Sequence, residues 1–285
     1  MEIDKLFSSK SPDKKETGSD VHKYLGLIDA LEYYPLIYGL KENLLEHEFN
    51  IIYTTPDRAA KQLKEGEVEL ALIPAIEYAR KKETWRIIPD LCITCSGAVK
   101  NTQLFFKKGL KEIKKVAVDK NAVVSFILLK ILMKEKFMMD PEFVFMDPDI
   151  EKMLAHAEAA LLTGEHAFGN LHLYPNRLDL NEEWVDLTGL PFVYSFWAGR
   201  EFTVTKEEIG TIIKSYELGI RNLEKISKDY ALNHSQNWAF YHDFLTKTIQ
   251  YTLNDRAKEG LAEYYSYAFF FGFTEFIPDL LFYPF

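Results

Sequence analysis

The chain has 285 residues, of which 47% are hydrophobic and 27% are charged, as in a globular protein of one large or two medium domains. Its formal net charge of −9 argues against nucleic acid as a partner, because binding phosphates requires a basic surface. No apolar run is long enough for a membrane span, and the first residues lack an apolar signal core. We therefore expect a cytoplasmic protein without a membrane partner, in which residues 1–20 form a disordered tail.

The first part of the chain alternates short apolar runs with helical patterns. We expect strands at 24–31, 48–55 and 68–73, each followed by a helix. Thr55 before Pro56 predicts a helix start with a hydroxyl cap. Gly66 predicts a left-handed helix end. This alternation indicates a parallel α/β sheet.

The two cysteines of the chain, Cys92 and Cys95, lie in the apolar stretch LCITC. A CxxC pair can be a redox site, but that chemistry favours a thiol at a helix N-terminus, and this stretch is typical of a strand. We therefore favour buried structural thiols. Two cysteines do not complete a four-ligand zinc site, and no histidine pair has metal spacing nearby, so no metal is expected.

A second α/β series follows, and then a helical region. Extended residues 96–108 lead to strands at 115–118, 142–146 and 157–163, and helices are expected at 121–137, at 148–156 and from Gly164. Thr205 and Glu208 predict a capping box. The apolar stripe of the helix that follows comprises Ile209, Ile212, Ile213, Tyr216, Ile220 and Leu223, and two more helices are expected at 235–254 and 256–272.

This order predicts two lobes, because the chain leaves the first α/β unit, builds the second and returns. The crossings are expected near 95–105 and 188–198. Lobe 1 would comprise 21–97 and 192–285, with the C-terminal helices, and lobe 2 would comprise 98–191. A small molecule would bind in the cleft between the lobes. Tyr194, Phe196 and Trp197 on the returning segment are expected in the core, although alternate side chains of a strand can face a cleft.

The returning segment, TGLPFVYSFWAGR, resembles the signature segment of the chorismate dehydratases of the futalosine route to menaquinone. Four more segments resemble that family in order and spacing: YYPLIYGL, LKEGEVELALIPAIEYA, IIPDLCITCSGAVKNTQLF and AEAALLTGEHAF. The resemblance implies a two-lobed α/β fold like that of type II periplasmic binding proteins. It also implies a cytoplasmic lyase that removes water from chorismate to give 3-[(1-carboxyvinyl)oxy]benzoate, without a metal or an organic cofactor.

Several positions depart from the family pattern. Glu32 stands where the family usually has asparagine, Asn101 where it has serine, and Glu165 where it has aspartate. At the start of the 121–137 helix, Asp119 and Ser125 are kept, but apolar residues 122–124 (Ala-Val-Val) replace polar ones. Two alternatives therefore stay open: a related enzyme whose substrate carries fewer acidic groups, and a non-catalytic binding protein of the same fold.

Dehydration of chorismate requires groups that hold two carboxylates, assist loss of a ring proton and assist departure of a hydroxyl. We predict that Glu32 and Asn101 are catalytic, with the pKa of Glu32 raised by Tyr33 and Tyr34. A helix N-terminal acid and a turn asparagine are the alternative interpretations. Helix starts supply N–H donors for anions. The predicted ligand-binding residues are Tyr34, Pro74, Thr102, Asn121, Ser125, Thr163, Gly164 and Glu165.

Overall fold

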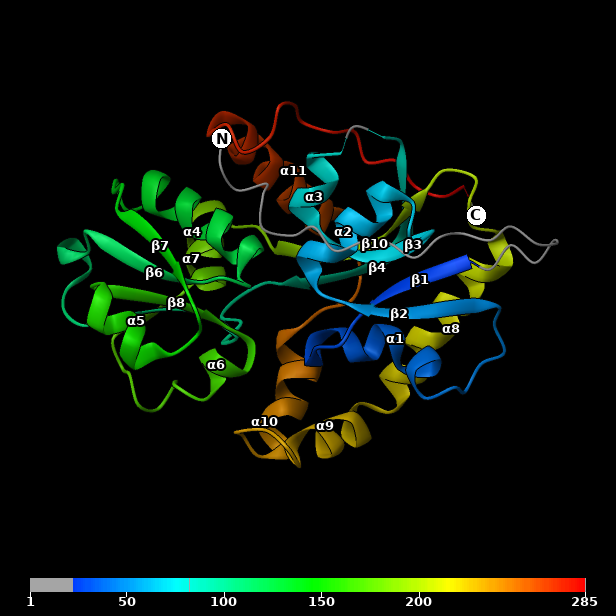
Figure 1. Ribbon diagram of the computed structural model, residues 1–285, viewed down its shortest axis with the longest axis horizontal. Helices are drawn as coiled ribbons and strands as arrows, with labels where there is room; N and C mark the ends of the chain where they lie inside the picture. The colour runs from blue at the N-terminus through cyan, green and yellow to red at the C-terminus, as the bar shows by residue number, and fades with distance from the viewer. Residues whose placement is uncertain (1–22, 82, 285) are drawn as a thin grey trace, which may run out of the picture.

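The computed structural model describes residues 23–81 and 83–284, so the predicted tail, 1–20, lies outside the described residues. Two five-stranded sheets form the centres of two lobes that lie side by side (Figure 1). The strand order is β2-β1-β3-β10-β4 in the first sheet and β7-β6-β8-β5-β9 in the second. The two-lobed α/β fold is thus the one that the sequence predicts.

The first sheet is mixed rather than wholly parallel. Strands β1 (Lys23–Ile28), β2 (Phe49–Thr54) and β3 (Leu70–Pro74) are parallel, as predicted. Strand β10 (Phe192–Arg200) then lies antiparallel between β3 and β4 (Trp85–Cys95). The expectation of a purely parallel sheet is wrong here, because the chain returns from the second lobe into the gap between two strands of the first.

Short helices follow the first three strands. They are a 3₁₀ turn, η1 (Leu31–Tyr33), with α1 (Tyr34–Lys41) directly after it, then α2 (Pro56–Glu65) and α3 (Ala75–Ala79). Helix α2 begins at Pro56 and ends at Gly66, whose φ of 75° is left-handed, as predicted. The predicted hydroxyl cap is wrong, because the side chain of Thr55 makes no capping hydrogen bond.

The second sheet contains the short strands of lobe 2. These are β5 (Thr102–Phe106), β6 (Lys115–Asp119), β7 (Glu142–Met146), β8 (Ala159–Thr163) and β9 (Arg177–Asp179). Strands β6, β7 and β8 are parallel, whereas β5 is antiparallel to β8. A 3₁₀ turn, η2 (Leu110–Glu112), precedes β6, and the helices are α4 (Val123–Glu135), α5 (Ile150–His156), α6 (Gly164–Phe168) and α7 (Leu180–Thr188).

Strand β9 and helix α7 occupy a polar run for which the sequence analysis predicts no element. The side chain of Asp179 caps α7 by accepting hydrogen bonds from the backbone N–H groups of Asn181 and Glu182. Leu180 and Trp184 supply its buried apolar contacts. With so few apolar residues, the helix gives a weak periodic signal, and the aspartate cap was the signal that could have located it.

The C-terminal region begins with α8 (Lys206–Arg221), where the predicted capping box of Thr205 and Glu208 is confirmed. The predicted stripe is too wide, because Ile213 and Ile220 are exposed. The buried face instead comprises Ile209, Ile212, Ser215 and Gly219, whose small members let α1 approach closely. The helix stops before Leu223, where α9 (Leu223–Ala231) begins.

The predicted helix at 235–254 is wrong over its second half. Helix α10 (Trp238–Asp243) passes into a π-helical turn, η3 (Phe244–Thr248), and the chain then becomes extended. This extended segment pairs with β4, since Thr94 N–H donates to the carbonyl of Gln250 at 2.9 Å and Cys92 N–H to that of Tyr251 at 3.0 Å. Pairing with a sheet edge satisfies the backbone there in place of helical bonds.

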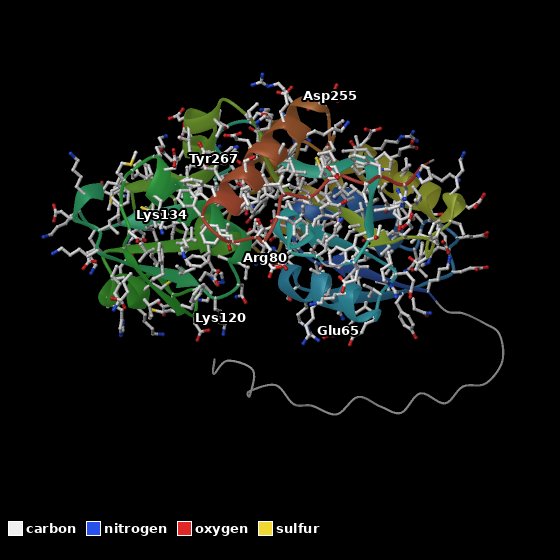
Figure 2. The ribbon with its side chains drawn as sticks, turned by 90° about the horizontal axis from the view of Figure 1, so that it is seen from above. Glu65, Arg80, Lys120, Lys134, Asp255 and Tyr267 are labelled. Atoms are coloured by element: carbon white, nitrogen blue, oxygen red, sulfur yellow. The ribbon has the colours of Figure 1, made fainter. Side chains whose placement is uncertain are left out.

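The last helix, α11 (Asp255–Phe270), packs on β10 and α3 of lobe 1 and also reaches α4 of lobe 2. Figure 2 shows it lying over the junction of the lobes, from Asp255 at one end to Tyr267 near Lys134 of α4. Trp184 of α7 meets Phe192 of β10 edge-on at 5.5 Å and Tyr264 of α11 at 6.1 Å. A single apolar core cluster therefore includes residues of both sheets.

Both cysteines are buried free thiols, as predicted. Burial raises the pKa of Cys95 to about 12 and that of Cys92 further still. A thiol with so high a pKa is a poor nucleophile, so the structural interpretation holds. Among the described residues, no helix is both long enough and apolar enough to span a membrane.

Candidate functional site

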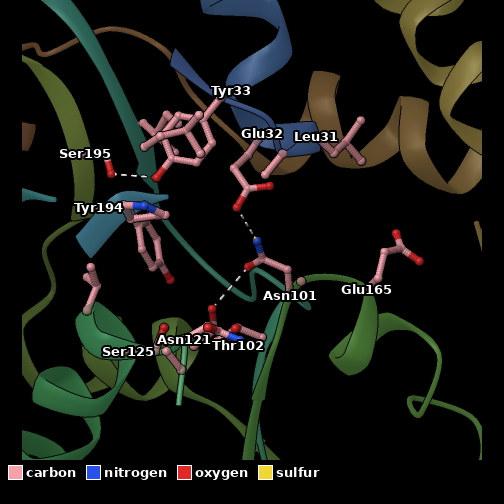
Figure 3. Close-up of a pocket in the computed structure, with 18 of the residues that line it drawn as sticks. Leu31, Glu32, Tyr33, Asn101, Thr102, Asn121, Ser125, Glu165, Tyr194 and Ser195 are labelled. Atoms are coloured by element: carbon pink, nitrogen blue, oxygen red, sulfur yellow. Dashed lines mark hydrogen bonds between the residues drawn. The ribbon is translucent and has the colours of Figure 1, made fainter. Parts of the chain in front are cut away.

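A cavity of about 440 Å³ lies between the two lobes, where the carboxyl ends of β1, β2, β6 and β8 meet (Figure 3). These strand ends place η1 and the starts of α2, α4 and α6 around one space, as expected of crossover connections in α/β sheets. The segment after β4 and strand β10 close the remaining sides. The lining includes Asp29–Tyr33, Thr54–Pro56, Asn101, Thr102, Asn121–Ser125, Thr163–Glu165, Phe168, Tyr194, Ser195 and Tyr230.

The structure brings together most of the residues that the sequence singled out, from both lobes. Glu32, Asn101, Thr102, Asn121, Ser125, Thr163, Gly164 and Glu165 all line this cavity. Tyr34 and Pro74 do not. Tyr34 packs outside the cavity against Lys41, whose Nζ lies 3.9 Å from the centre of its ring. Pro74 pairs with Ser195 of β10, and of these two residues only Ser195 lines the cavity.

Glu32 and Asn101 meet across the gap between the lobes. The Nδ2 group of Asn101 donates a hydrogen bond to Oε1 of Glu32 at 3.4 Å (Figure 3). Asn101 is 8% exposed, and its Oδ1 accepts from the hydroxyl of Thr102 at 3.2 Å. Its carbonyl accepts from the N–H of Gly164 at 2.8 Å. Asn101 therefore makes three hydrogen bonds, and its side-chain NH₂ group donates to the carboxyl group of Glu32.

The pKa of Glu32 is raised, as expected, although Tyr34, one of the two tyrosines expected to cause the shift, does not line the cavity. The main cause is burial, which penalises the charged form. A backbone hydrogen bond opposes this shift, and the negative charge of Glu165 adds to it. The protonated form of Glu32 is thus favoured more than in a free glutamate.

Glu165 is fixed by the loop between α9 and α10. Its Oε2 accepts hydrogen bonds from the hydroxyl of Ser235 at 3.1 Å, from the N–H of Ser235 at 3.4 Å and from the hydroxyl of Tyr241 at 3.0 Å. The Oε1 atom is buried without a hydrogen-bond partner in the described part of the chain. Phe168, one turn later, packs edge-on against Phe240 and Phe244. These contacts tie α6 of lobe 2 to the C-terminal helices.

The opposite wall is formed by the start of α4. Oδ1 of Asp119 accepts from the N–H of Asn121 at 2.9 Å and from its side-chain amide at 3.2 Å, which fixes the turn before the helix. No side chain caps the helix at Ala122, so its first N–H groups have no intrahelical acceptor. Ser125, in this first turn, is 6% exposed, and its hydroxyl makes no hydrogen bond within the described residues. This wall offers donors without a positive side chain.

Several lining residues were not among the predicted ligand-binding residues. Tyr33 shares a 2.8 Å hydrogen bond with Ser195, and Tyr194, expected in the core, reaches the cavity and donates to Oδ1 of Asn181 at 3.1 Å. Tyr230 comes from α9. The position of Tyr194 and Ser195 on the returning strand was a usable signal, whereas nothing in the pattern around Tyr230 marks it. Phe196 and Trp197 are fully buried, as predicted.

The charges around the cavity are all of one sign. Asp29, Glu32 and Glu165 line it, and none of the described lining residues is Lys, Arg or His. Asp29 is neutralised from behind by Lys41 at 2.6 Å; although burial alone raises its pKa, hydrogen bonds from Lys41 and Tyr34 lower it on balance. Among the described residues, no group of acidic, His or Cys side chains has the arrangement of a metal site.

A ligand-sized space between two α/β lobes, lined by helix starts, is typical of small-molecule-binding proteins. Solved structures share this architecture. Protein AF1704 from Archaeoglobus fulgidus has a TM-score of 0.74 at 19% identity, covering 90% of this chain and 100% of its own. The alkanesulfonate-binding protein SsuA from Xanthomonas axonopodis pv. citri, bound to MOPS, has a TM-score of 0.61 at 14% identity, covering 92% of this chain and 96% of its own. The fold is therefore that of the periplasmic binding proteins.

The sequence comparisons give the family. The model of the menaquinone biosynthesis family matches residues 24–269, and the chain belongs to this family. The chorismate dehydratase of Thermus thermophilus is 26% identical over 198 residues, which cover 63% of this chain and 72% of that protein.

Proposed function

We propose that the chain is a cytoplasmic carbon–oxygen lyase of the chorismate dehydratase type, which removes water from chorismate in menaquinone biosynthesis without a metal or an organic cofactor. The family and the similarity to a chorismate dehydratase support the reaction class. The observation that carries the proposal is the meeting of Glu32 and Asn101 with the uncapped start of α4 in one cavity. Together they offer a proton-transfer group and an anion-binding wall.

The start of α4 is the proposed site for a substrate carboxylate. Free N–H groups and the positive end of the helix dipole bind anions without a cationic side chain. The unpaired hydroxyl of Ser125 and the amide of Asn121 would add donors. This arrangement is consistent with a chain whose overall charge is −9 and which nevertheless binds an acid.

One observation favours a second candidate, a related lyase whose substrate carries fewer acidic groups. Three carboxylates line the cavity, and its described lining contains no cationic side chain. A second substrate carboxylate placed near Glu32 and Glu165 would be repelled if both were ionised. The protonation state of Glu32 therefore decides between the two candidates.

The test is incubation of the purified protein with chorismate, followed by mass spectrometry of the product. Formation of 3-[(1-carboxyvinyl)oxy]benzoate supports the proposal, and no turnover by folded protein overturns it. A thermal-shift screen with chorismate and with monocarboxylate and neutral analogues runs in parallel. Stabilisation by the analogues alone would favour the second candidate.

A further inference from the structure

We infer that Glu32 enters the reaction protonated and gives its proton to the departing hydroxyl, and that Glu165 is a positioning residue that adds to the effect of burial on Glu32. The inference rests on the proposed function and assigns roles to two residues of its site. The geometry of the Glu32 carboxyl group supports the first of these roles. Oε1 of Glu32 accepts the N–H of Asn101, which leaves Oε2 as the oxygen that carries a proton toward the cavity (Figure 3).

Among the described residues that line the cavity around Glu32, none carries a positive charge that would stabilise its ionised form. The acid that faces it is Glu165 of α6, and Asp29 on its own side of the cavity is paired with Lys41. The other titratable groups that interact with Glu32 are tyrosines from four elements: Tyr33 of η1, Tyr194 of β10, Tyr230 of α9 and Tyr251 of the extended segment. Burial raises the pKa of each tyrosine, so all four are neutral and supply no charge.

Glu165, in contrast, has several hydrogen-bond donors. Three hydrogen-bond donors, from Ser235 and Tyr241, converge on its Oε2. A buried carboxyl group with few hydrogen-bond donors favours its neutral form. Glu32 has one long hydrogen bond from a side chain, at 3.4 Å, so its protonated form is favoured.

The other acidic protons at the cavity are poor candidates for the leaving group. The hydroxyl of Tyr33 is engaged with Ser195, and that of Tyr194 with Asn181. Burial also raises the pKa of both phenols above the ordinary value, which makes them weaker acids. A neutral carboxylic acid is a much stronger proton donor at neutral pH.

The step balances around this single group. Oε2 of Glu32 transfers its proton to the ring hydroxyl, the C–O bond breaks with its electron pair on oxygen, and water departs. Loss of water leaves a positive charge on the ring. The adjacent ring carbon then loses its proton to the Glu32 carboxylate. That C–H electron pair completes the aromatic ring, and Glu32 is protonated again. The acidic lining and the lack of cations among the described lining residues both favour the developing positive charge.

The first experiment is the pH dependence of kcat for the wild type, Glu32→Gln and Glu165→Gln. The active form of Glu32 is the protonated one, so wild-type kcat is expected to fall as pH rises through its raised pKa. Glu32→Gln keeps a side chain of similar shape but has no transferable acid, so a loss of roughly 100-fold or more in kcat is expected. Glu165→Gln removes the charge that raises the pKa of Glu32, so the fall is expected at lower pH.

Glu151→Gln on α5 is the matched control. Glu151 is exposed and outside the cavity, and the substitution removes the same unit of charge. Its kcat and pH profile are expected to equal those of the wild type. An unmoved profile in Glu165→Gln, or wild-type turnover by Glu32→Gln, would overturn the inference.

A second experiment separates failure of this inference from failure of the proposed function, because it needs no substrate. Infrared difference spectra of the substrate-free protein during a pH titration report protonated carboxyl groups. A band that is absent in Glu32→Gln and titrates above the ordinary glutamate value of 4.5 supports the protonated state. Turnover without such a band overturns the role of Glu32 but leaves the lyase. The band without turnover of chorismate overturns the lyase, and the transfer step with it.

Discussion

The two walls of the cavity differ in chemistry and in how the fold supports them. The lobe 1 wall presents Glu32 on a short 3₁₀ turn that leads directly into α1, and α1 is held by close packing on α8. The lobe 2 wall presents Asn101 and the start of α4, and its backbone is held by a buried carboxylate, that of Asp179. We call these the acid wall and the donor wall.

Because of this difference, the two walls are destabilised by different kinds of substitution. Packing between helices fails when volume is added, because interiors are close-packed. A hydrogen-bonded centre fails when an acceptor is lost, because buried donors are then left unpaired. Three substitutions, in order of decreasing expected effect, separate these cases.

The largest effect on stability is expected from Gly219→Ala, which disrupts the packing of α8 against α1 behind the acid wall. A Cβ at Gly219 would lie 2.0 Å from the carbonyl oxygen of Pro35, a backbone atom of α1. We expect a loss of about 3 kcal/mol in the free energy of unfolding, measured by chemical denaturation, because α1 or α8 must shift.

Gly210→Ala in the same helix is the control. A Cβ there meets nothing within 4 Å, so we expect a gain of roughly 0.5–1 kcal/mol from the better helix propensity of alanine. Equal stability of the two variants would show that α1 does not depend on this close approach.

An intermediate effect on stability is expected from Asp179→Asn, which removes hydrogen bonds that hold the backbone of the donor wall. Oδ1 of Asp179 accepts from the N–H of Val99 at 3.1 Å and Oδ2 from that of Lys100 at 2.6 Å, just before Asn101. An asparagine must turn its NH₂ group toward one of these donors in either orientation. We expect a loss of about 2 kcal/mol in the free energy of unfolding.

Asp186→Asn, on the exposed side of the same helix α7, is the matched control, since its pairing with Lys136 at 3.5 Å is largely solvated. We expect a change within about 0.5 kcal/mol. A small effect of Asp179→Asn, like that of its control, would contradict the role of Asp179.

The smallest effect is expected from Ser125→Ala, which removes one donor from the donor wall without disturbing its fold. The hydroxyl makes no hydrogen bond in the described structure, so stability should be nearly unchanged. Loss of one hydrogen bond to a bound carboxylate, about 1 kcal/mol, predicts roughly fivefold weaker binding of chorismate by calorimetry. Ser266→Ala on the exposed face of α11 should bind like the wild type. Unchanged affinity in Ser125→Ala would remove this residue from the site.

Sequence patterns predicted the two α/β series, the return of the chain and most of the residues around the cavity, because strand ends and helix starts have local signals. The resemblance to the family singled out Glu32, Asn101 and Ser125 among the residues at these strand ends and helix starts. The roles of these residues, and the exact limits of the two lobes, stay predictions.

Features set by distant contacts could not be predicted. Helix α7 has few apolar residues, and its cap, Asp179, also serves a loop far away in sequence. The extended segment at 249–253 exists because β4 offers it an edge. Tyr34 and Pro74 lie where the local pattern predicts a helix start. In the structure Tyr34 packs against Lys41 and Pro74 pairs with Ser195 of β10, and neither lines the cavity.

The place of β10 between β3 and β4 has a consequence for synthesis of the chain. Strands β3 and β4 leave the ribosome early, but the strand that joins them arrives only after the whole second sheet has been translated. Until then β3 has one unpaired edge and β4 has two, since the segment that pairs with the outer edge of β4 is made later still; nascent chains associate wrongly on such edges. The second sheet is built from strands that follow one another in the chain, β5 to β9, and has no such wait, so we expect it to fold before the first sheet is complete.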